Sequence, residues 1–266
     1  MSTTSGGAVR RNRRVLAAVA GAILVGDLMV AAAASAHAAP QVRVNRAHHH
    51  HSSQPLPRAD RKYVAPYTFT ATLKHGAPGY AGKNSKSPKM TVPKKWRGHV
   101  SVMPITNATK TRVKVRLARR PDEAQAWVNR RAVKIGVTTF SLVLDLSQRR
   151  MYKFKAGKQL GSYPVGEGLP QTPTPTGNYF IAFHANPNGP GYGVVMLETS
   201  AHSKVIRTFE GGNDAIIAIH GPITPASNAA IGKNGTRISN GCIRMHGPQL
   251  LKIAWVTDGT PLAIVP

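Results

Sequence analysis

Residues 238–245 are Ile238-Ser239-Asn240-Gly241-Cys242-Ile243-Arg244-Met245, and they hold the only cysteine of the 266-residue chain. Upstream, the apolar run 215–219 predicts a buried strand that ends on His220. A thiol attacks only as its thiolate, and a neighbouring imidazole can take the thiol proton. The two segments, with 18 residues between His220 and Ser239, therefore predict a Cys/His nucleophilic site.

The residues around this pair suggest how such a site could work. Gly241 lets the backbone turn tightly and leaves nearby amide groups open to a developing oxyanion. No Asp or Glu lies near Cys242 or His220 in the sequence, so we expect a backbone carbonyl to fix the histidine tautomer. An inert buried thiol and a structural histidine are the alternatives. Three other histidines are rival bases: His184, His202 and His246.

The N-terminus predicts export. Residues 10–14 carry four arginines, residues 15–34 are mostly apolar, and Ala36-His37-Ala38 is a small-x-small cleavage pattern. This order is typical of a secretory signal peptide cleaved near Ala38. An uncleaved membrane anchor is the alternative, although Asp27 interrupts the apolar run. Exported proteins normally pair their cysteines as disulfides, so a lone cysteine in such a protein indicates a reactive thiol.

The charge is concentrated in the front half. The chain has a net charge of +26, and residues 39–138 contain 21 Lys and Arg against 3 Asp and Glu. Such a surface favours polyanions. Because export removes nucleic acid as a target, we expect either an anionic cell-wall polymer as partner or a charge that only keeps the protein soluble. Contact with a membrane is expected only through the N-terminal segment, if it stays uncleaved.

We predict a mainly β protein in four segments, because glycine and proline are frequent and helical spacing is rare. Residues 1–38 are the signal peptide or anchor, and residues 39–62 are a basic linker. The linker includes His48 to His51, which could bind a metal weakly. We interpret them as low-complexity tether, because no other ligand cluster accompanies them. Residues 63–137 are a small basic β domain, and residues 138–266 form a second β domain.

Short alternating strands identify the small β domain. Residues 68–73, 100–103 and 112–117 alternate apolar and polar side chains, and Gly/Pro turns separate them. Together with Val113-Lys114-Val115-Arg116-Leu117 and Ala126-Trp127-Val128, this pattern resembles the small SH3-like domains that precede cell-wall enzymes in some bacteria.

The second β domain begins with a β-meander. Phe140, Leu142, Leu144 and Leu146 fall on one face of a strand, and two further strands follow. A proline-rich loop covers residues 166–177, and residues 247–256 show the clearest helical spacing.

Several motifs of this domain resemble the L,D-transpeptidase catalytic domain (the YkuD-like family). Ile219-His220-Gly221 and the cysteine stretch, from Ser239 to Met245, resemble its active-site signature. The opening strand 145–152, the loop 174–177 and the closing residues 259–262 match in the expected order. The resemblance covers about half of the chain.

The resemblance implies a β-rich domain with one or two short helices that acts on peptidoglycan stem peptides without a metal or other cofactor. Cys242 would be the nucleophile and His220 the general base and acid. The Gly241 amide would contribute to the oxyanion hole, and the Gly221 carbonyl would orient His220. The substrate-binding residues would be Ser239, Asn240 and Arg244.

The implied reaction releases D-Ala, passes through a thioester and cross-links two diamino acids. Many family members have histidine where this chain has Asn240, which leaves the role of that position open. Two other functions also remain open: an L,D-carboxypeptidase or hydrolase, in which water resolves the thioester, and a cell-wall-binding protein without catalytic activity.

Overall fold

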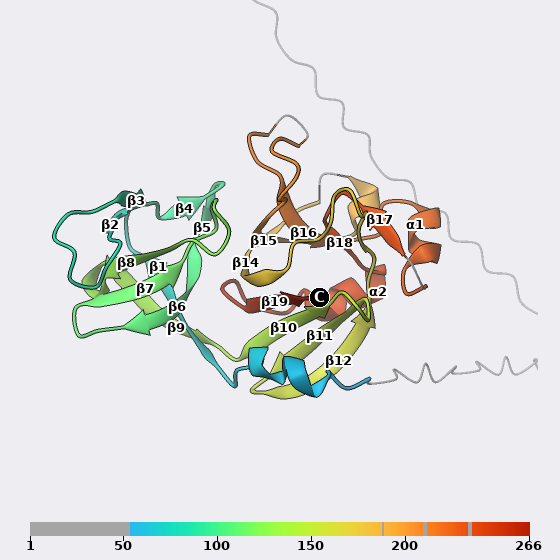
Figure 1. The fold of residues 1–266 in the computed structure, drawn as a ribbon, viewed down its shortest axis with the longest axis horizontal. Coiled ribbons are helices and arrows are strands. Elements are labelled where there is room, and N and C mark those ends of the chain that lie inside the picture. Colours follow the sequence, from blue (N-terminus) through green and yellow to red (C-terminus); the bar gives the residue numbers. More distant parts are fainter. Residues whose placement is uncertain (1–53, 188, 210–211, 234–235) are drawn as a thin grey trace, which may run out of the picture. The chain divides into compact units, whose positions relative to one another are not determined.

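The computed structural model describes residues 54–187, 189–209, 212–233 and 236–266 (Figure 1). The chain divides into two compact units, 1–48 and 49–266, and every element below belongs to the second. The predicted signal peptide and His48 to His51 lie outside the described residues. The export of the protein and the tether therefore remain predictions. Among the described residues, no helix has both the length and the apolar character needed to cross a membrane.

The prediction of a mainly β protein is confirmed, because strands dominate the described residues and helices are few and short. The small β domain contains one antiparallel sheet in the order β8-β7-β6-β1-β9. Its strands are β1 (Thr68–Leu73), β6 (Val102–Ala108), β7 (Arg112–Arg116), β8 (Gln125–Asn129) and β9 (Val133–Thr138), with the 3₁₀ turn η2 (Arg130–Ala132) between the last two.

Alternating side chains give this domain its own core. In β7, Val113 and Val115 are fully buried. The polar residues that alternate with them, Arg112, Lys114 and Arg116, are half-exposed. Two short antiparallel ladders complete the domain. They are β2 (Ala77–Gly79) with β3 (Met90–Val92), and β4 (Lys95–Trp96) with β5 (His99–Val100). The SH3-like assignment of this sheet stays a prediction.

The C-terminal domain is built on an eight-stranded sheet in the order β12-β11-β10-β19-β14-β15-β16-β18. These strands are β10 (Phe140–Asp145), β11 (Arg150–Lys155), β12 (Lys158–Pro164), β14 (Gly177–Ala185), β15 (Met196–His202), β16 (Ile216–His220), β18 (Ile243–Arg244) and β19 (Pro261–Val265). The final strand β19 lies parallel to β10 and antiparallel to β14, so it joins the meander to the strands that carry the histidine and the cysteine.

The remaining elements of this domain are short. They are η3 (Pro190–Tyr192), α1 (Pro225–Ala230), α2 (Gly247–Ile253), and the paired strands β13 (Glu167–Gly168) and β17 (Arg237–Ser239). Helix α2 falls where the spacing predicted one, and it buries Leu250 and Ile253 in the main core. The Lys153 ammonium group donates a hydrogen bond to the Lys252 carbonyl near the end of this helix.

Part of the predicted linker is built into the C-terminal domain. The 3₁₀ helix η1 (Arg58–Tyr63) precedes β1. Leu56 is buried against Val143, Tyr152 and neighbouring apolar side chains. The Leu56 amide also donates a hydrogen bond of 3.0 Å to the Gln159 side chain. Residues 54–63 therefore cover one face of the meander. A single leucine in a polar stretch gives no periodic signal, which is why its sequence indicated only a linker.

Candidate active site

The predicted histidine and cysteine are brought together by a pair of parallel strands. β16 and β18 pair in register, with Ile219 opposite Ile243 and His220 opposite Arg244. Both isoleucines are fully buried in the main core. Because side chains alternate between the two faces of a strand, His220 and the two residues that flank Ile243 face away from that core. Cys242, which is half-buried, is one of these residues.

His220 is held in one tautomer. Its side chain is buried, and Nδ1 lies 2.7 Å from the Gly221 carbonyl oxygen. A carbonyl oxygen only accepts, so Nδ1 carries the hydrogen and Nε2 of the neutral ring keeps its lone pair. Burial lowers the pKa of His220 to about 4; the hydrogen bond to Gly221 opposes this shift and the charge of Arg244 adds to it. At neutral pH the imidazole is therefore a neutral base.

Tyr192 covers the histidine ring. It ends η3, and the centroids of the Tyr192 and His220 rings are 4.8 Å apart. The Gly221 amide donates to the Tyr192 carbonyl at 2.7 Å, so the backbones on both sides of the rings are joined. Sequence reasoning missed this residue, because its segment predicted only a Gly/Pro/Asn loop. The one signal in the sequence that could have identified Tyr192 is that it is a lone aromatic residue in such a loop.

Ser239 shapes the turn that presents the cysteine. Its buried hydroxyl donates to the Cys242 carbonyl at 2.6 Å and accepts the Gly241 amide at 3.1 Å. Gly241 has a φ of 113°, and a Cβ there would lie 2.9 Å from Cδ1 of Ile217. Only glycine fits this position without strain.

These hydrogen bonds give two predicted site residues tasks that differ from those expected. The sequence predicted that Ser239 contacts the substrate. In the structure its hydroxyl makes both of its hydrogen bonds inside the turn, so it positions the backbone. The Gly241 amide, predicted to stabilise an oxyanion, already has Ser239 Oγ as acceptor. Asn240, by contrast, is exposed at the tip of the turn and can meet a substrate.

Arg244 lies beside the cysteine and is anchored by helix α1. Its Nη1 donates to the Ser227 hydroxyl at 3.0 Å. Burial lowers the pKa of Arg244, and the ionised forms of Cys242 and Tyr192 act in the opposite direction. Nε of Arg244 is buried, and no described residue accepts its hydrogen. The guanidinium can therefore stabilise a thiolate and still donate to a ligand.

The rival histidines have other partners. Nδ1 of His184 lies 2.7 Å from Asp258, and this carboxylate raises the pKa of His184 despite the opposing effect of burial. His202 contacts Asp122. His246, which directly precedes α2, contacts the side chain of Asn228 in α1. Of the described histidines, only His220 lies on a strand that pairs with β18.

Within the described part of the chain, no group of three or more His, Cys, Asp or Glu side chains could hold a metal ion. The chemistry that the arrangement supports is acyl transfer, since it combines a thiol, a neutral imidazole base and a nearby guanidinium.

Residues 139–264 match the YkuD family model, the L,D-transpeptidase catalytic domain. This segment includes β16, β18 and the whole cysteine turn. The resemblance stated from the active-site signature is thus confirmed for the C-terminal domain.

Individual relatives agree with the family match. A protein of Bacillus subtilis (strain 168) that carries the provisional name L,D-transpeptidase YkuD is 32% identical over 135 residues. The match covers 50% of this chain and 63% of that relative, which is less than two thirds of its length.

Two solved structures are also similar. An L,D-transpeptidase from Mycobacterium smegmatis is 15% identical, with a TM-score of 0.37. The match covers 62% of this chain and 90% of the chain of that structure. The L,D-transpeptidase LdtMt1 in complex with imipenem has 15% identity and a TM-score of 0.39, covering 80% of this chain and 87% of its own.

Proposed function

We propose that the C-terminal domain is a cysteine-dependent L,D-transpeptidase that acts on peptidoglycan stem peptides. The observation that carries the proposal is the pairing of β16 with β18. This pairing sets His220, with Nδ1 tied to Gly221, on the same face as Cys242 and Arg244. The family match of residues 139–264 supports the substrate class.

In the proposed reaction, Nε2 of His220 takes the proton of the Cys242 thiol. The thiolate attacks the carbonyl carbon of the amide that joins a diamino acid to D-Ala. The imidazolium then gives its proton to the D-Ala nitrogen as the C–N bond breaks, which leaves a thioester. An amine of a second stem peptide attacks the thioester, loses a proton to His220 and forms the cross-link. The proton returns to the thiolate, so the thiol is restored.

The surrounding residues take supporting roles in this proposal. The Gly221 carbonyl keeps the proton on Nδ1 of His220. Arg244 stabilises the thiolate before attack and the charge that develops on the substrate oxygen, as fixed donors do in acyl-transfer sites. Asn240 is exposed beside the nucleophile and contacts the stem peptide. The Gly241 amide hydrogen already bonds to Ser239 Oγ, so it contributes to the oxyanion hole by sharing this hydrogen between the two oxygens.

Two alternatives make different predictions about turnover. In an L,D-carboxypeptidase, water resolves the thioester, so D-Ala is released at the same rate without an acceptor stem. In a cell-wall-binding protein without activity, no D-Ala is released and no acyl-enzyme forms. Two features favour the catalytic functions: His220 lies on the strand that pairs with β18, and Arg244 lies two residues from Cys242.

We also propose that the protein works outside the cytoplasm, in cell-wall assembly and the maintenance of cell shape, because its first 38 residues have the pattern of a signal peptide. The small β domain would hold the enzyme near anionic wall polymers. Its exposed lysines at positions 83, 86, 89, 94 and 95 support this part of the proposal.

Intact-protein mass spectrometry with imipenem tests the nucleophile. We expect one covalent adduct on the wild-type protein and none on Cys242→Ala. His220→Ala should slow acylation by about 100-fold or more, while His246→Ala, the same change at a nearby histidine, should leave it within a factor of about three. An adduct of equal yield on Cys242→Ala would overturn the assignment.

A second assay distinguishes the transpeptidase from the hydrolase. The enzyme is mixed with a tetrapeptide stem, with or without an acceptor stem, and products are separated by mass. The transpeptidase predicts a cross-linked dimer and acceptor-dependent release of D-Ala. Release of D-Ala that does not depend on the acceptor, with no dimer, would establish the hydrolase instead.

A further inference from the structure

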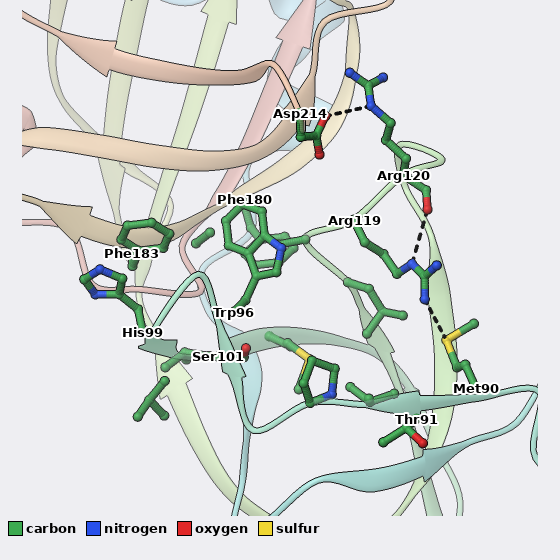
Figure 2. A pocket seen from close by; sticks show the side chains of 18 of the residues that line it. Met90, Thr91, Trp96, His99, Ser101, Arg119, Arg120, Phe180, Phe183 and Asp214 are labelled. Atoms are coloured by element: carbon green, nitrogen blue, oxygen red, sulfur yellow. Dashed lines mark hydrogen bonds and ion pairs between the residues drawn. The ribbon is translucent and has the colours of Figure 1, made fainter. Parts of the chain in front are cut away.

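A second part of the structure contains a cavity of about 480 Å³, whose lining residues are drawn in Figure 2. It is lined on one side by the small β domain, from Met90 to Arg120, and on the other by Phe180, Ala182, Phe183 and residues 213–214. None of the residues assigned to the cysteine site lines it. Its volume falls in the range of pockets that hold small molecules.

Strand β14 supplies an aromatic wall because its two faces have different neighbours. Tyr179 and Ile181 belong to the main core, while Phe180, Ala182 and Phe183 form a separate apolar cluster with Trp96 packed against it. The pairing of β14 with β15 is irregular between Ile181 and Phe183. Such an irregularity lets two successive residues face the same side of a sheet.

The β4–β5 hairpin packs against this wall and extends it. Arg97 and Gly98 both have positive φ, which suits a tight two-residue hairpin. The turn sets the His99 ring flat against Phe183, with centroids 3.9 Å apart and planes at 7°. Trp96 meets the same phenylalanine edge-on, with centroids 5.7 Å apart. These three rings form a continuous aromatic surface.

The other end of the cavity carries positive charge. Figure 2 shows His99 and Phe183 on one side and Arg119 with Met90 on the other. Arg120 is neutralised, because its Nε lies 2.7 Å from Asp214. Arg119 is exposed and donates only to the Arg120 carbonyl, at 3.2 Å, and towards the Met90 sulfur, at 3.8 Å. Within the described ranges, no carboxylate forms an ion pair with Arg119.

We propose that this cavity binds a small amphipathic carboxylate. The flat apolar part of the ligand lies on the aromatic surface beside Trp96 and Phe180, and its carboxylate pairs with the guanidinium of Arg119. A guanidinium offers parallel N–H groups that match a carboxylate, and a flat apolar body gains contact with aromatic faces. Asp214 neutralises Arg120, but no carboxylate among the described residues neutralises Arg119. The positive charge of Arg119 therefore selects an anion. This inference does not depend on the proposed transpeptidase activity.

Fluorescence displacement tests the site on the protein expressed without residues 1–38. The reporter is 8-anilinonaphthalene-1-sulfonate, and the competitors are naphthalene-2-carboxylate and its neutral carboxamide. We expect saturable binding of one reporter, and displacement by the carboxylate at a concentration at least about tenfold lower than by the carboxamide. Arg119→Gln should remove this preference, and Arg130→Gln, an exposed arginine of the same domain away from the cavity, should keep it.

A second variant tests the place of binding without changing the charge. Ser101 lines the cavity and is half-exposed, so Ser101→Trp should fill the space and lower affinity for both competitors at least about tenfold. Thermal unfolding and near-ultraviolet circular dichroism report whether each variant is folded. Equal affinity for carboxylate and carboxamide in the wild type would overturn the proposal, as would unchanged binding in both folded Arg119→Gln and folded Ser101→Trp.

Discussion

The side-chain hydroxyl of Thr174 donates a hydrogen bond to the carbonyl oxygen of Gly241, 2.8 Å away. The same hydroxyl accepts the Gly168 amide at 2.9 Å, and Thr174 is buried. The Leu169 amide adds a hydrogen bond of 2.8 Å to the Ser239 carbonyl. The proline-rich loop therefore holds the turn that comes directly before Cys242.

Replacing Thr174 with valine should loosen this turn. The change keeps the shape of the side chain but leaves the Gly241 carbonyl and the Gly168 amide without their buried partner. We expect a loss of about 1–3 kcal/mol in the free energy of unfolding and acylation by imipenem that is about tenfold slower. Urea titration and stopped-flow fluorescence measure the two. Thr176→Val, at an exposed position of the same loop, is the control, and an equal effect there would remove the special role of Thr174.

Replacing Ser239 with alanine distinguishes a turn residue from a substrate contact. Because the hydroxyl bridges the Gly241 amide and the Cys242 carbonyl, its loss should lower kcat for stem-peptide turnover by about tenfold or more and change KM little. Stability should fall by about 1–3 kcal/mol. Steady-state kinetics on folded protein provide the test. A raised KM at unchanged kcat would instead support the substrate-binding role predicted from the sequence.

The buried histidine predicts how stability depends on pH. Burial lowers the pKa of His220 from 6.5 to about 4, so the unfolded chain binds a proton at mildly acidic pH while the folded chain does not. The contribution of His220 is fully present above pH 6.5 and is lost as the pH falls towards 4, up to about 3 kcal/mol. Urea titrations at pH 7.5 and 5.0 should show a smaller difference for His220→Gln than for the wild type. Identical differences would mean that His220 is not buried as a neutral group.

A charge cluster joins the small β domain to the C-terminal domain. The His202 side chain is fully buried, with Nδ1 at 2.8 Å from Asp122 and Nε2 at 3.1 Å from Asp214. Nε2 is buried and makes no hydrogen bond to the described residues. Arg120 closes the cluster on Asp214.

His202→Gln should therefore destabilise the protein by about 3 kcal/mol, since it leaves two half-buried carboxylates with one guanidinium. Thermal and urea unfolding measure the loss. His75→Gln is the matched control, because His75 is exposed on the small β domain and such surface changes stay within about 0.5 kcal/mol. Equal stability of the two variants would show that the cluster does not hold the domains together.

The exposed lysines of the small β domain predict salt-dependent binding to anionic cell wall. Changing Lys83, Lys86 and Lys89 to glutamine should weaken co-sedimentation with purified wall severalfold at low salt and little at high salt. The same three positions changed to arginine keep the charge and should bind as the wild type does. Unchanged binding of the glutamine variant would favour a charge that only maintains solubility.

The sequence predicted much of the fold because its signals are local. Alternation of apolar side chains located strands such as β7 and β10, and apolar spacing located α2. The lone cysteine and the apolar strand before His220 identified the two side chains that β16 and β18 bring together, since a strand's burial pattern also decides which residues face away from the core.

The sequence by itself thus determined the mainly β class, the basic surface and the choice of Cys242 and His220 as the candidate pair. Only the tertiary structure decided what surrounds them. Tyr192 over His220, Thr174 beneath the cysteine turn and Asp122 against His202 join residues that are 28, 67 and 80 positions apart. Such contacts arise from how loops close over the sheet, and loop conformation leaves no periodic pattern in the chain.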